Sequence, residues 1–416
     1  MRKIDLQDIG ILACPGGIHF AEEVIGHLRS IASRKVSSQL QSLSKKYSIP
    51  EKDLLQKYSL NRDLFTIQDA SPHHNGSKLI PDFRIHASFT RFANGEFKTA
   101  IKSSIRGKDI YIFQDVANHY PITFSDSQSS HFLTVNDHFF CLLTTVDAAL
   151  QAGAARVTVV VPTYPYSRQH KKKGREGLTA ARFGQILEYM GVNRIITLDI
   201  HSREIENCFN HLRLENLHAS YQVLRALSTV VDLKDDSLAI VSPDTGSVER
   251  NKFYASALNR PLAMLYKERD YSKVTLNAKD SNITNVHLLG SVENKTVFMG
   301  DDILGSGGTL LKAMEKLKER GAKKIICAVS LPFFTGDAID HYEEAYRKKL
   351  FDTIIGTNAV FHDERLHLRE WYLSANVSRL FAKTIFRLSF NLSLSPLLDN
   401  RDIIKRLLRD KQKQRK

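Results

Sequence analysis

The sequence contains few of the residues that close small secreted domains or bind structural metals. Only four of its 416 residues are cysteine, at positions 14, 141, 208 and 327, and their spacing does not repeat. Scattered cysteines favour reduced thiols over a disulfide framework. Cys208 and His211 form one Cys-x-x-His pair, but no second pair completes a zinc site. The cysteines therefore argue against a disulfide-rich domain and against a zinc module.

Long apolar runs and a secretion signal are also missing. No apolar stretch reaches the roughly 18 residues of a membrane-spanning helix, and a hydrophobic content of 42% is ordinary for a globular chain. Asp5 and Asp8 interrupt the N-terminal stretch in which a signal peptide has its apolar region. These absences predict a cytoplasmic protein that does not bind a membrane.

Acidic residues are fewer than basic ones, which gives a formal net charge of +14. Residues 401–416 carry eight basic and two acidic side chains, so this tail accounts for less than half of the excess. A basic balance suits polyanionic ligands, either nucleotides or nucleic acid. A short basic tail is more often a solvated helix end than a binding arm, and charge alone therefore does not select a function.

Short apolar runs alternate with helical patterns along most of the chain. We predict strands at 9–14, 110–113, 157–161, 195–200, 238–241, 262–265, 286–289, 296–299, 325–331 and 351–355, and helices at 21–31, 136–150, 179–190, 217–227, 251–258, 310–317 and 337–346. Strands that are continuous apolar runs indicate parallel sheets buried on both faces. The chain is long enough for two or three domains. The pattern predicts an α/β fold with helices that flank central parallel sheets.

The stretch that fixes the chemistry most closely is residues 297–309. A predicted strand ends in Asp301 and Asp302, and a loop of small residues at 305–309 leads into a helical pattern. Such a loop turns backbone N–H groups and a helix N-terminus toward one point, which suits a phosphate. The two carboxylates can accept hydrogen bonds from sugar hydroxyls or hold a divalent metal. Together they indicate a ribose 5-phosphate site, and the alternative is a solvated turn capped by an aspartate.

Residues 301–309 resemble the phosphoribosyl-binding loop of type I phosphoribosyltransferases and of ribose-phosphate diphosphokinases (PRPP synthetases). The order of further motifs over residues 84–361 resembles the second family. These motifs are Phe92-x-Asn94-Gly95-Glu96, Arg106-Gly107-Lys108-Asp109, Asn136-Asp137, Tyr166-Ser167-Arg168-Gln169, Asp199-x-His201, Ser242-Pro243-Asp244-x-Gly246 and Lys267-x-Arg269. A phosphoribosyltransferase is expected to share the first loop but not the whole series.

This resemblance implies two tandem phosphoribosyltransferase-like domains. We expect the first over residues 1–215, the second over 216–362, and a C-terminal extension with a basic tail over 363–416. Stretches 37–77 and 117–133 are expected to be insertions. The implied reaction transfers the β,γ-diphosphoryl group of ATP to the C1 hydroxyl of ribose 5-phosphate, which gives PRPP and AMP. The resemblance further implies Mg²⁺ as the cofactor and a homo-oligomer, either a dimer or a hexamer, as the assembly.

The resemblance also implies roles for individual residues. Lys267 and Arg269 are expected to be catalytic, at the start of a flexible flap over 271–285. The remaining expected site residues are Phe92, Asn94, Glu96, Arg168, Gln169 and His201 for ATP, Asp301, Asp302, Ser306, Gly307, Gly308 and Thr309 for ribose 5-phosphate, and His201 and Asp244 for the metal.

Several positions depart from the family pattern. Asn94 replaces an aspartate, Ser247 a glycine and Glu268 an arginine, and Gly305 stands where the loop usually has a third aspartate. The departures at 268 and 305 favour an alternative, in which the protein is a catalytically weak, regulatory homologue that binds other synthetase subunits. The retained cations of the flap, Lys267 and Arg269, argue against this alternative. A phosphoribosyltransferase and a basic nucleic-acid-binding protein with a borrowed fold are two further alternatives, and binding to nucleic acid is not expected.

Overall fold

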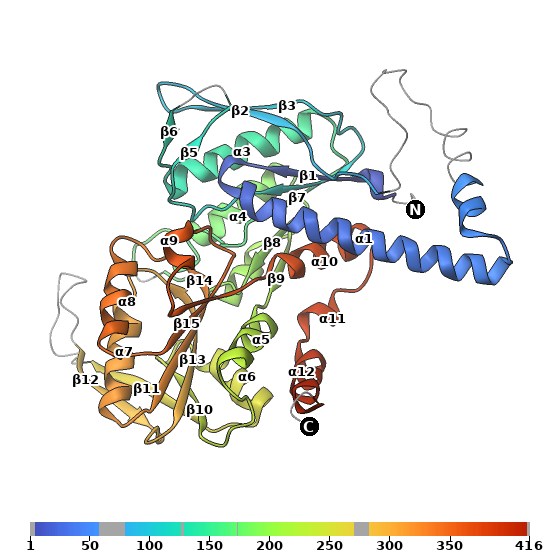
Figure 1. Ribbon diagram of the computed structural model, residues 1–416. Helices are drawn as coiled ribbons and strands as arrows, with labels where there is room; N and C mark the ends of the chain where they lie inside the picture. Colours follow the sequence, from blue (N-terminus) through green and yellow to red (C-terminus); the bar gives the residue numbers. More distant parts are fainter. Residues whose placement is uncertain (1–4, 58–79, 126–128, 173, 270–282, 414–416) are drawn as a thin grey trace.

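The computed structural model describes residues 5–57, 80–125, 129–172, 174–269 and 283–413. The chain forms two α/β units that follow one another in sequence and are stacked in Figure 1. Each unit is built on a sheet of mainly parallel strands with helices packed on it. The predicted α/β fold, with helices that flank central parallel sheets, is confirmed.

The first sheet has the strand order β1-β4-β7-β8-β9, and all its neighbouring strands are parallel. Its strands are β1 (Ile9–Ala13), β4 (Asp109–Phe113), β7 (Arg156–Val160), β8 (Arg194–Leu198) and β9 (Arg213–Leu217). Alternate side chains enter different cores, as expected for a sheet buried on both faces. Tyr111 and Phe113 of β4 belong to the core that contains α1 (Ile18–Tyr47), whereas Ile110 and Ile112 belong to the core that contains α3 (Val135–Gln151) and α4 (Thr179–Tyr189).

The second sheet has the order β12-β11-β10-β13-β14-β15-β16, in which only the edge pair β11–β12 is antiparallel among the described strands. Its strands are β10 (Leu238–Ser242), β11 (Leu262–Arg269), β12 (Ile283–Leu289), β13 (Thr296–Leu304), β14 (Lys324–Pro332), β15 (Thr353–Thr357) and β16 (Tyr372–Ala375). Helices that pack in this unit include α5 (Ser220–Val230), α6 (Val248–Leu258), α7 (Gly308–Glu319), α8 (Ala338–Arg347) and α9 (Glu364–His367).

One apolar core joins the two units. It contains Phe20 of α1, Leu224 of α5 (Ser220–Val230), Phe298 of β13 and Phe381 of α10 (Ser378–Ser389). The rings of Phe20 and Phe381 meet edge to face with centroids 5.0 Å apart. Helix α10 runs beside α1 in Figure 1, so the two ends of the chain cover the same face of the first sheet.

The structure differs from the sequence-based prediction at the C-terminus. Residues beyond Asp363 were expected to leave the alternating pattern and form an extension, but β16 adds a parallel strand to the second sheet. The strand escaped prediction because it has only four residues. After α10, two further helices follow, α11 (Ser395–Leu398) and α12 (Arg401–Lys413).

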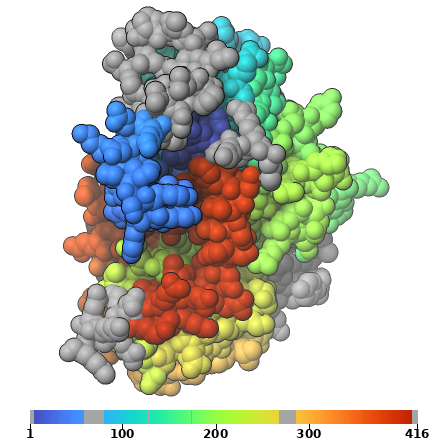
Figure 2. All heavy atoms as spheres, turned by 90° about the vertical axis from the view of Figure 1, so that its right-hand side faces the viewer, coloured from blue at the N-terminus to red at the C-terminus, as the bar shows by residue number. Residues whose placement is uncertain are grey.

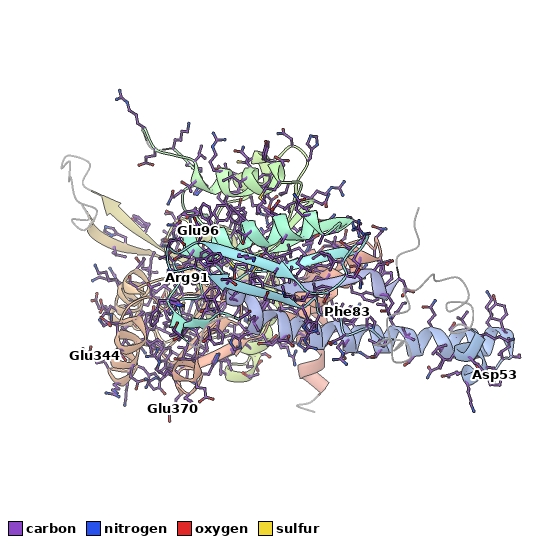
Figure 3. The ribbon with its side chains drawn as sticks, turned by 90° about the horizontal axis from the view of Figure 1, so that it is seen from above. Asp53, Phe83, Arg91, Glu96, Glu344 and Glu370 are labelled. Atoms are coloured by element: carbon purple, nitrogen blue, oxygen red, sulfur yellow. The ribbon has the colours of Figure 1, made fainter. Side chains whose placement is uncertain are left out.

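The N-terminal helix is longer than predicted, since α1 continues from Ile18 to Tyr47 and passes through the first part of the expected insertion. Its buried side chains end at Ala32, and the remaining turns extend away from the body of the first unit (Figure 1). Figure 3, seen from above, has Asp53 at the far end of this arm. The polar outer turns lack the apolar periodicity on which the prediction of the helix rested.

Two expected loops contain strands. Strand β11 was predicted to end at residue 265 but continues to Arg269, because its backbone pairs with β12. Residues 271–282 of the expected flap lie outside the described part of the chain. In the expected insertion 117–133, β5 (Ile122–Thr123) pairs with β6 (Ser130–His131). A second hairpin, β2 (Ala87–Arg91) with β3 (Phe97–Ile101), carries the Asn-Gly turn.

Within the described ranges, no helix is long and apolar enough to span a membrane.

Candidate active site

A cavity of about 1460 Å³ lies at the carboxyl ends of β8, β10 and β13, where the two units meet. Open α/β sheets bind their ligands at this edge. Its wall also includes the start of α6, the start of α7 and a stretch of the C-terminal segment. The predicted residues that line it are Arg168, His201, Asp244, Asp301, Asp302, Ser306, Gly307, Gly308 and Thr309. The structure therefore brings all of the predicted ribose 5-phosphate and metal residues to one cavity.

The loop 305–309, which we call the phosphate loop, connects β13 to α7 by a turn that requires glycine. Gly307 has φ of +77°, and a Cβ atom at this position would lie 2.3 Å from the ring of Tyr342. Among the residues that the structure describes, no side chain caps the N-terminus of α7, and the first turn of this helix carries no acidic residue. The first N–H groups of the helix thus remain available to an anion in the cavity.

Asp301 and Asp302 stand beside the phosphate loop in different electrostatic environments. Asp301 accepts hydrogen bonds from Ser247 Oγ at 2.8 Å and from the backbone N–H of Asp302 at 2.9 Å. Burial, together with the neighbouring charge of Asp302, raises the pKa of Asp301 to about 7. Burial opposes the charge of Asp302 as well, but the hydrogen bond from His201 and the charge of Arg250 hold its pKa below the usual range.

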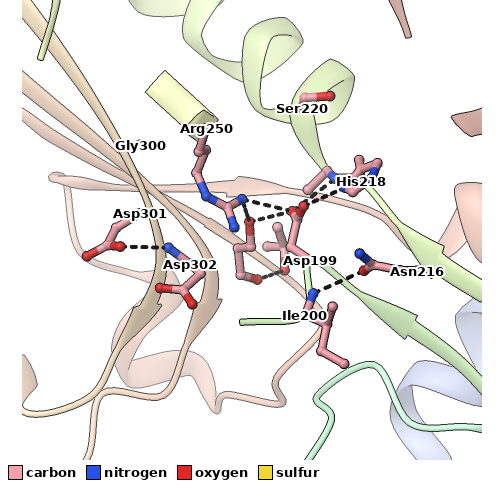
Figure 4. A network of polar contacts seen from close by, with 12 residues as sticks. Asp199, Ile200, Asn216, His218, Ser220, Arg250, Gly300, Asp301 and Asp302 are labelled. Carbon is pink, nitrogen blue, oxygen red and sulfur yellow. Dashed lines mark hydrogen bonds and ion pairs between the residues drawn. The ribbon is translucent and has the colours of Figure 1, made fainter. Parts of the chain in front are cut away.

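His201 reaches this pair from the first unit. Its Nδ1 lies 2.5 Å from Oδ2 of Asp302, across the boundary between the two units. The His170 ring meets that of His201 edge to face, with centroids 5.4 Å apart. The histidine follows β8, and Figure 4 shows Asp302 on β13. The contact brings the Asp199-x-His201 motif to the paired aspartates, as expected from parallel strands whose carboxyl ends share one edge.

The buried carboxylate of Asp199, two residues before His201, is held by several hydrogen bonds and an ion pair. Asp199 accepts hydrogen bonds from Ser330 Oγ at 2.6 Å, His218 Nδ1 at 3.0 Å and the backbone N–H of Ala219 at 3.2 Å. Arg250 Nη1 lies 3.3 Å from the same carboxylate. Burial by itself would raise the pKa of Asp199, but Arg250, His218 and Ser330 outweigh it and hold the pKa well below its usual range. We call these four side chains the Asp199 network (Figure 4).

Sequence reasoning did not find the partners in this network. Asp199 was part of a motif, but His218, Arg250 and Ser330 come from three other segments with no pattern that links them. The only local signal was that Arg250 follows the Ser-Pro-Asp motif by a few residues. Asp199 itself has φ of +42°, a left-handed conformation that is uncommon for a side-chain-bearing residue and is often found near functional sites.

The predicted adenine-binding residues lie elsewhere. Phe92, Asn94 and Glu96 sit at the turn of the β2–β3 hairpin and are not among the described residues that line the cavity. Figure 3 shows Glu96 beside Arg91 at that end of the hairpin. Phe92 is 45% exposed, and the Asn94 side chain accepts a hydrogen bond from the backbone N–H of Glu96 within the turn. Gln169 is likewise absent from the described lining, although Arg168 is present.

Lys267 and Arg269 lie on the edge hairpin of the second sheet. The backbone of Lys267 pairs with Val286 and that of Arg269 with Ile283, with an irregularity in register just before Arg269. The hairpin lies beside β10, whose end carries Asp244. The catalytic role of the two cations stays a prediction.

Oxygen donors for a metal are present in the cavity, but not as a preformed cage. Among the described residues, no group of three or more His, Cys, Asp or Glu side chains is arranged to hold a metal ion. Asp244 accepts the backbone N–H of Ser247 at 2.9 Å through Oδ1 and lines the cavity with Asp301 and Asp302. Such a set suits a hard cation that takes only one or two carboxylates from the protein.

Comparison with known proteins agrees with this geometry. Residues 82–191 match the family model for the N-terminal domain of ribose phosphate pyrophosphokinase, and residues 212–365 match the phosphoribosyl transferase domain. Ribose-phosphate pyrophosphokinase A of Dictyostelium discoideum is 31% identical over 311 residues, which are 74% of this chain and 89% of that protein. Ribose-phosphate pyrophosphokinase 4 of Saccharomyces cerevisiae is 32% identical over 308 residues, which are 74% of this chain and 85% of that protein.

Phosphoribosylpyrophosphate synthetase from Mycobacterium smegmatis has the same fold. The crystal structure of that protein superimposes with a TM-score of 0.66 at 22% sequence identity, and the match covers 92% of this chain and 99% of the other. At this identity the likeness supports the architecture only, whereas the sequence matches define the relationship. The resemblance predicted from the motifs is confirmed, and the chain belongs to the ribose-phosphate pyrophosphokinase family.

Proposed function

We propose that this protein is a ribose-phosphate diphosphokinase, an enzyme that transfers the β,γ-diphosphoryl group of ATP to the C1 hydroxyl of ribose 5-phosphate. The products are PRPP and AMP. The observation that carries the proposal is the single cavity in which the phosphate loop, the paired aspartates and His201 meet, in a chain that belongs to this family. The cytoplasmic location expected from the sequence stays a prediction.

In this proposal, ribose 5-phosphate binds along the edge formed by β13 and α7. The free N–H groups at the start of α7 and the hydroxyls of Ser306 and Thr309 hold the 5-phosphate. Asp301 and Asp302 accept hydrogen bonds from the ribose hydroxyls, which turns the C1 hydroxyl toward the rest of the cavity. The uncapped helix and the exposure of Ser306 and Thr309 to the cavity support these roles.

ATP would bind across the cavity from the sugar. Arg168 and Gln169 follow the end of β7, and Arg168 offers a forked set of donors to phosphate oxygens. The hairpin with Phe92, Asn94 and Glu96 lies away from the described lining of this cavity. A homo-oligomer, either a dimer or a hexamer, would let the hairpin of a neighbouring copy meet the adenine, and this proposal accounts for the exposed Phe92 ring.

The donor set fits Mg²⁺, which in phosphoryl-transfer enzymes binds one or two carboxylates and completes its shell with water and substrate phosphates. Asp244 and His201 would hold it, with the aspartates of β13 close by. When bound, the ion neutralises charge on the phosphate oxygens. This chain's own residues supply the in-line placement of the two substrates, on which phosphoryl transfer chiefly depends.

Lys267 and Arg269 would stabilise the charge that builds on the transferred group. Each is worth roughly 2–4 kcal/mol of barrier, by comparison with other electrostatic stabilisers of transition states. Their position on the hairpin beside β10 supports an approach to the cavity from the side of Asp244.

A regulatory, catalytically weak subunit is the second candidate, and Gly305 favours it. A Cβ atom at this position would meet only Thr335 Oγ1, at 3.8 Å, so packing leaves room for the aspartate that the family usually has there. The loss of that carboxylate is therefore a feature of the site rather than a steric necessity.

One assay separates these possibilities. Purified protein is incubated with Mg-ATP and ribose 5-phosphate, and AMP and PRPP are measured. Equimolar formation of both supports the enzyme. No turnover alone, together with a changed rate of an active synthetase when the two proteins are mixed, supports the regulatory subunit. Consumption of PRPP in the presence of a base would indicate a phosphoribosyltransferase, and salt-sensitive binding of RNA or DNA without turnover would contradict all three.

A further inference from the structure

The C-terminal segment forms one wall of the candidate active site. Ser395, Leu398, Asp399, Asn400 and Arg401 line the same cavity as the phosphate loop. In Figure 2 the C-terminal helices appear as a red band that runs down one face of the molecule and onto the yellow atoms of α6. Neither the sequence motifs nor the proposed reaction assigns these residues a role.

Helix α12 fixes this wall in place. Its Ile404 is only 1% exposed and belongs to the core that joins the two units, and Leu407 and Leu408 pack against that core. The helix contacts both α5 and α6. The apolar face of α12 is thus buried against the unit that carries the cavity, while its charged residues Lys405 and Arg406 are exposed.

Asn400 makes the polar contact between this wall and the rest of the site. Its side chain is buried, and its Nδ2 donates to Ser220 Oγ at 2.9 Å and more weakly to the carbonyl of His218 at 3.5 Å. These two residues flank Ala219, the N-cap of α5, whose own side chain cannot cap the helix. The side-chain amide of Asn400 therefore bonds to both ends of the short connection 218–220 between β9 and α5, which we call the corner.

The same corner also forms hydrogen bonds with the carboxylate of Asp199. His218 donates to one carboxylate oxygen and the N–H of Ala219 to the other. Asp199 is in a left-handed conformation, which persists only where surrounding contacts maintain it. The chain then reaches His201, which contacts Asp302 of the phosphate-loop strand. If the corner moved, its hydrogen bonds to Asp199 would change, and the position of His201, two residues further along the chain, would change with them.

We propose that Asn400 is a positioning residue, through which the C-terminal segment sets the orientation of Asp199 and His201 in the cavity. The carboxamide fixes the His218–Ser220 corner, the corner fixes the carboxylate of Asp199, and Asp199 fixes the loop that presents His201 to Asp302. The kinetic part of this proposal rests on the proposed diphosphokinase function, whereas its structural part does not.

The test compares Asn400→Ala with Arg406→Ala in the full-length protein. Arg406 is an exposed residue of the same helix outside the described lining of the cavity, so its replacement controls for a general effect on α12. We expect Asn400→Ala to lower kcat by about three- to tenfold, in line with the loss of one hydrogen bond that acts on the site. The Michaelis constant of ribose 5-phosphate should change less than twofold, because neither Asn400 nor His201 is proposed to touch the sugar.

Amide hydrogen exchange supplies a measurement that does not depend on turnover. In Asn400→Ala, amides of residues 199–202 should exchange several-fold faster than in the wild type, together with those of 217–220, and the Arg406→Ala protein should match the wild type. If the wild type makes no PRPP, the proposed function fails, but the exchange result still decides the structural part.

Unchanged exchange at 199–202 in a folded Asn400→Ala protein would overturn the proposal, and so would a fall in kcat of equal size in Arg406→Ala. Should Asn400→Ala not fold, Asn400→Ser takes its place, since its hydroxyl is too short to reach the corner but leaves a polar group at the position. The same two outcomes then apply to the serine variant.

Discussion

The phosphate loop and the Asp199 network lie in one cavity but are assembled in different ways. The loop is a single run of residues, 305–309, between a strand and the helix it begins. The network takes one side chain each from the turn after β8, the corner after β9, helix α6 and strand β14. In the proposed function, the loop would bind a phosphate through backbone N–H groups, for which small residues suffice. The network, in contrast, needs four particular side chains that folding brings together. The difference teaches that contiguous sites can be found in a sequence, while supporting networks emerge from the fold.

Removal of the central carboxylate should produce the largest effect and separate the two regions most clearly. Asp199→Ala leaves Arg250 largely buried without its partner, which typically costs about 3–5 kcal/mol of unfolding free energy. Urea unfolding measures this loss. The exposed pair Lys348–Glu344 provides the control, because solvent screens this ion pair and Lys348→Ala should leave the unfolding free energy close to that of the wild type. Equal stabilities of the two variants would show that the network does not support the fold.

Replacement of Lys267 tests a side chain that belongs neither to the phosphate loop nor to the Asp199 network. We expect Lys267→Ala to lower kcat by at least about a hundredfold, because the cation acts on charge that develops only in the transition state. The Michaelis constants for both substrates should stay close to those of the wild type. Steady-state kinetics with Mg-ATP and ribose 5-phosphate supply the measurement, and a normal kcat would remove this hairpin from the mechanism.

A methyl group in the phosphate loop should affect sugar binding more than stability of the second unit as a whole. Gly307→Ala places a Cβ atom 2.3 Å from Tyr342 in a backbone conformation with φ of +77°. The loop must shift, and we expect the Michaelis constant of ribose 5-phosphate to rise about tenfold or more, which corresponds to a strain of about 1–3 kcal/mol.

The matched control for this loop variant is Gly26→Ala, at a helical position where a Cβ atom meets no atom within 4 Å. It should leave the kinetics unchanged and stabilise α1 slightly, by up to about 1 kcal/mol. Isothermal titration with ribose 5-phosphate gives the affinity directly. An unaltered affinity in Gly307→Ala would contradict the assignment of this loop to the 5-phosphate.

The smallest effect is expected from the restoration of the family's third aspartate. Gly305→Asp has room beside Thr335, and the added carboxylate offers one more acceptor to the sugar. We expect the Michaelis constant of ribose 5-phosphate to fall by about two- to fivefold, the size of one net hydrogen bond, with that of ATP unchanged. An unchanged constant for the sugar would mean that another group already fills this role.

The same contrast explains what could be predicted from the sequence. Buried strands such as β7 and β10 were found because they are continuous apolar runs. The candidate residues 301–309 were found because they are contiguous in the sequence and form a recognisable motif, and the structure places them along the cavity. Strand β9 was missed because charged and polar residues interrupt it, and β16 because it is too short to show a pattern. Nothing in the sequence linked His218 or Ser330 to Asp199, since their meeting depends on the order of strands in two sheets.

The outer turns of α1, beyond Ala32, could tolerate insertion or deletion of residues in units of seven. The helix is about 45 Å long at 1.5 Å per residue, yet its buried contacts end at Ala32, roughly halfway along. Seven residues make almost two full turns, so deletion or duplication of such a unit after position 32 would rotate the remaining turns of α1 by only about 20°. Each such unit would change the length of the outer half of the helix by about 10 Å and would leave the buried inner half, up to Ala32, unchanged.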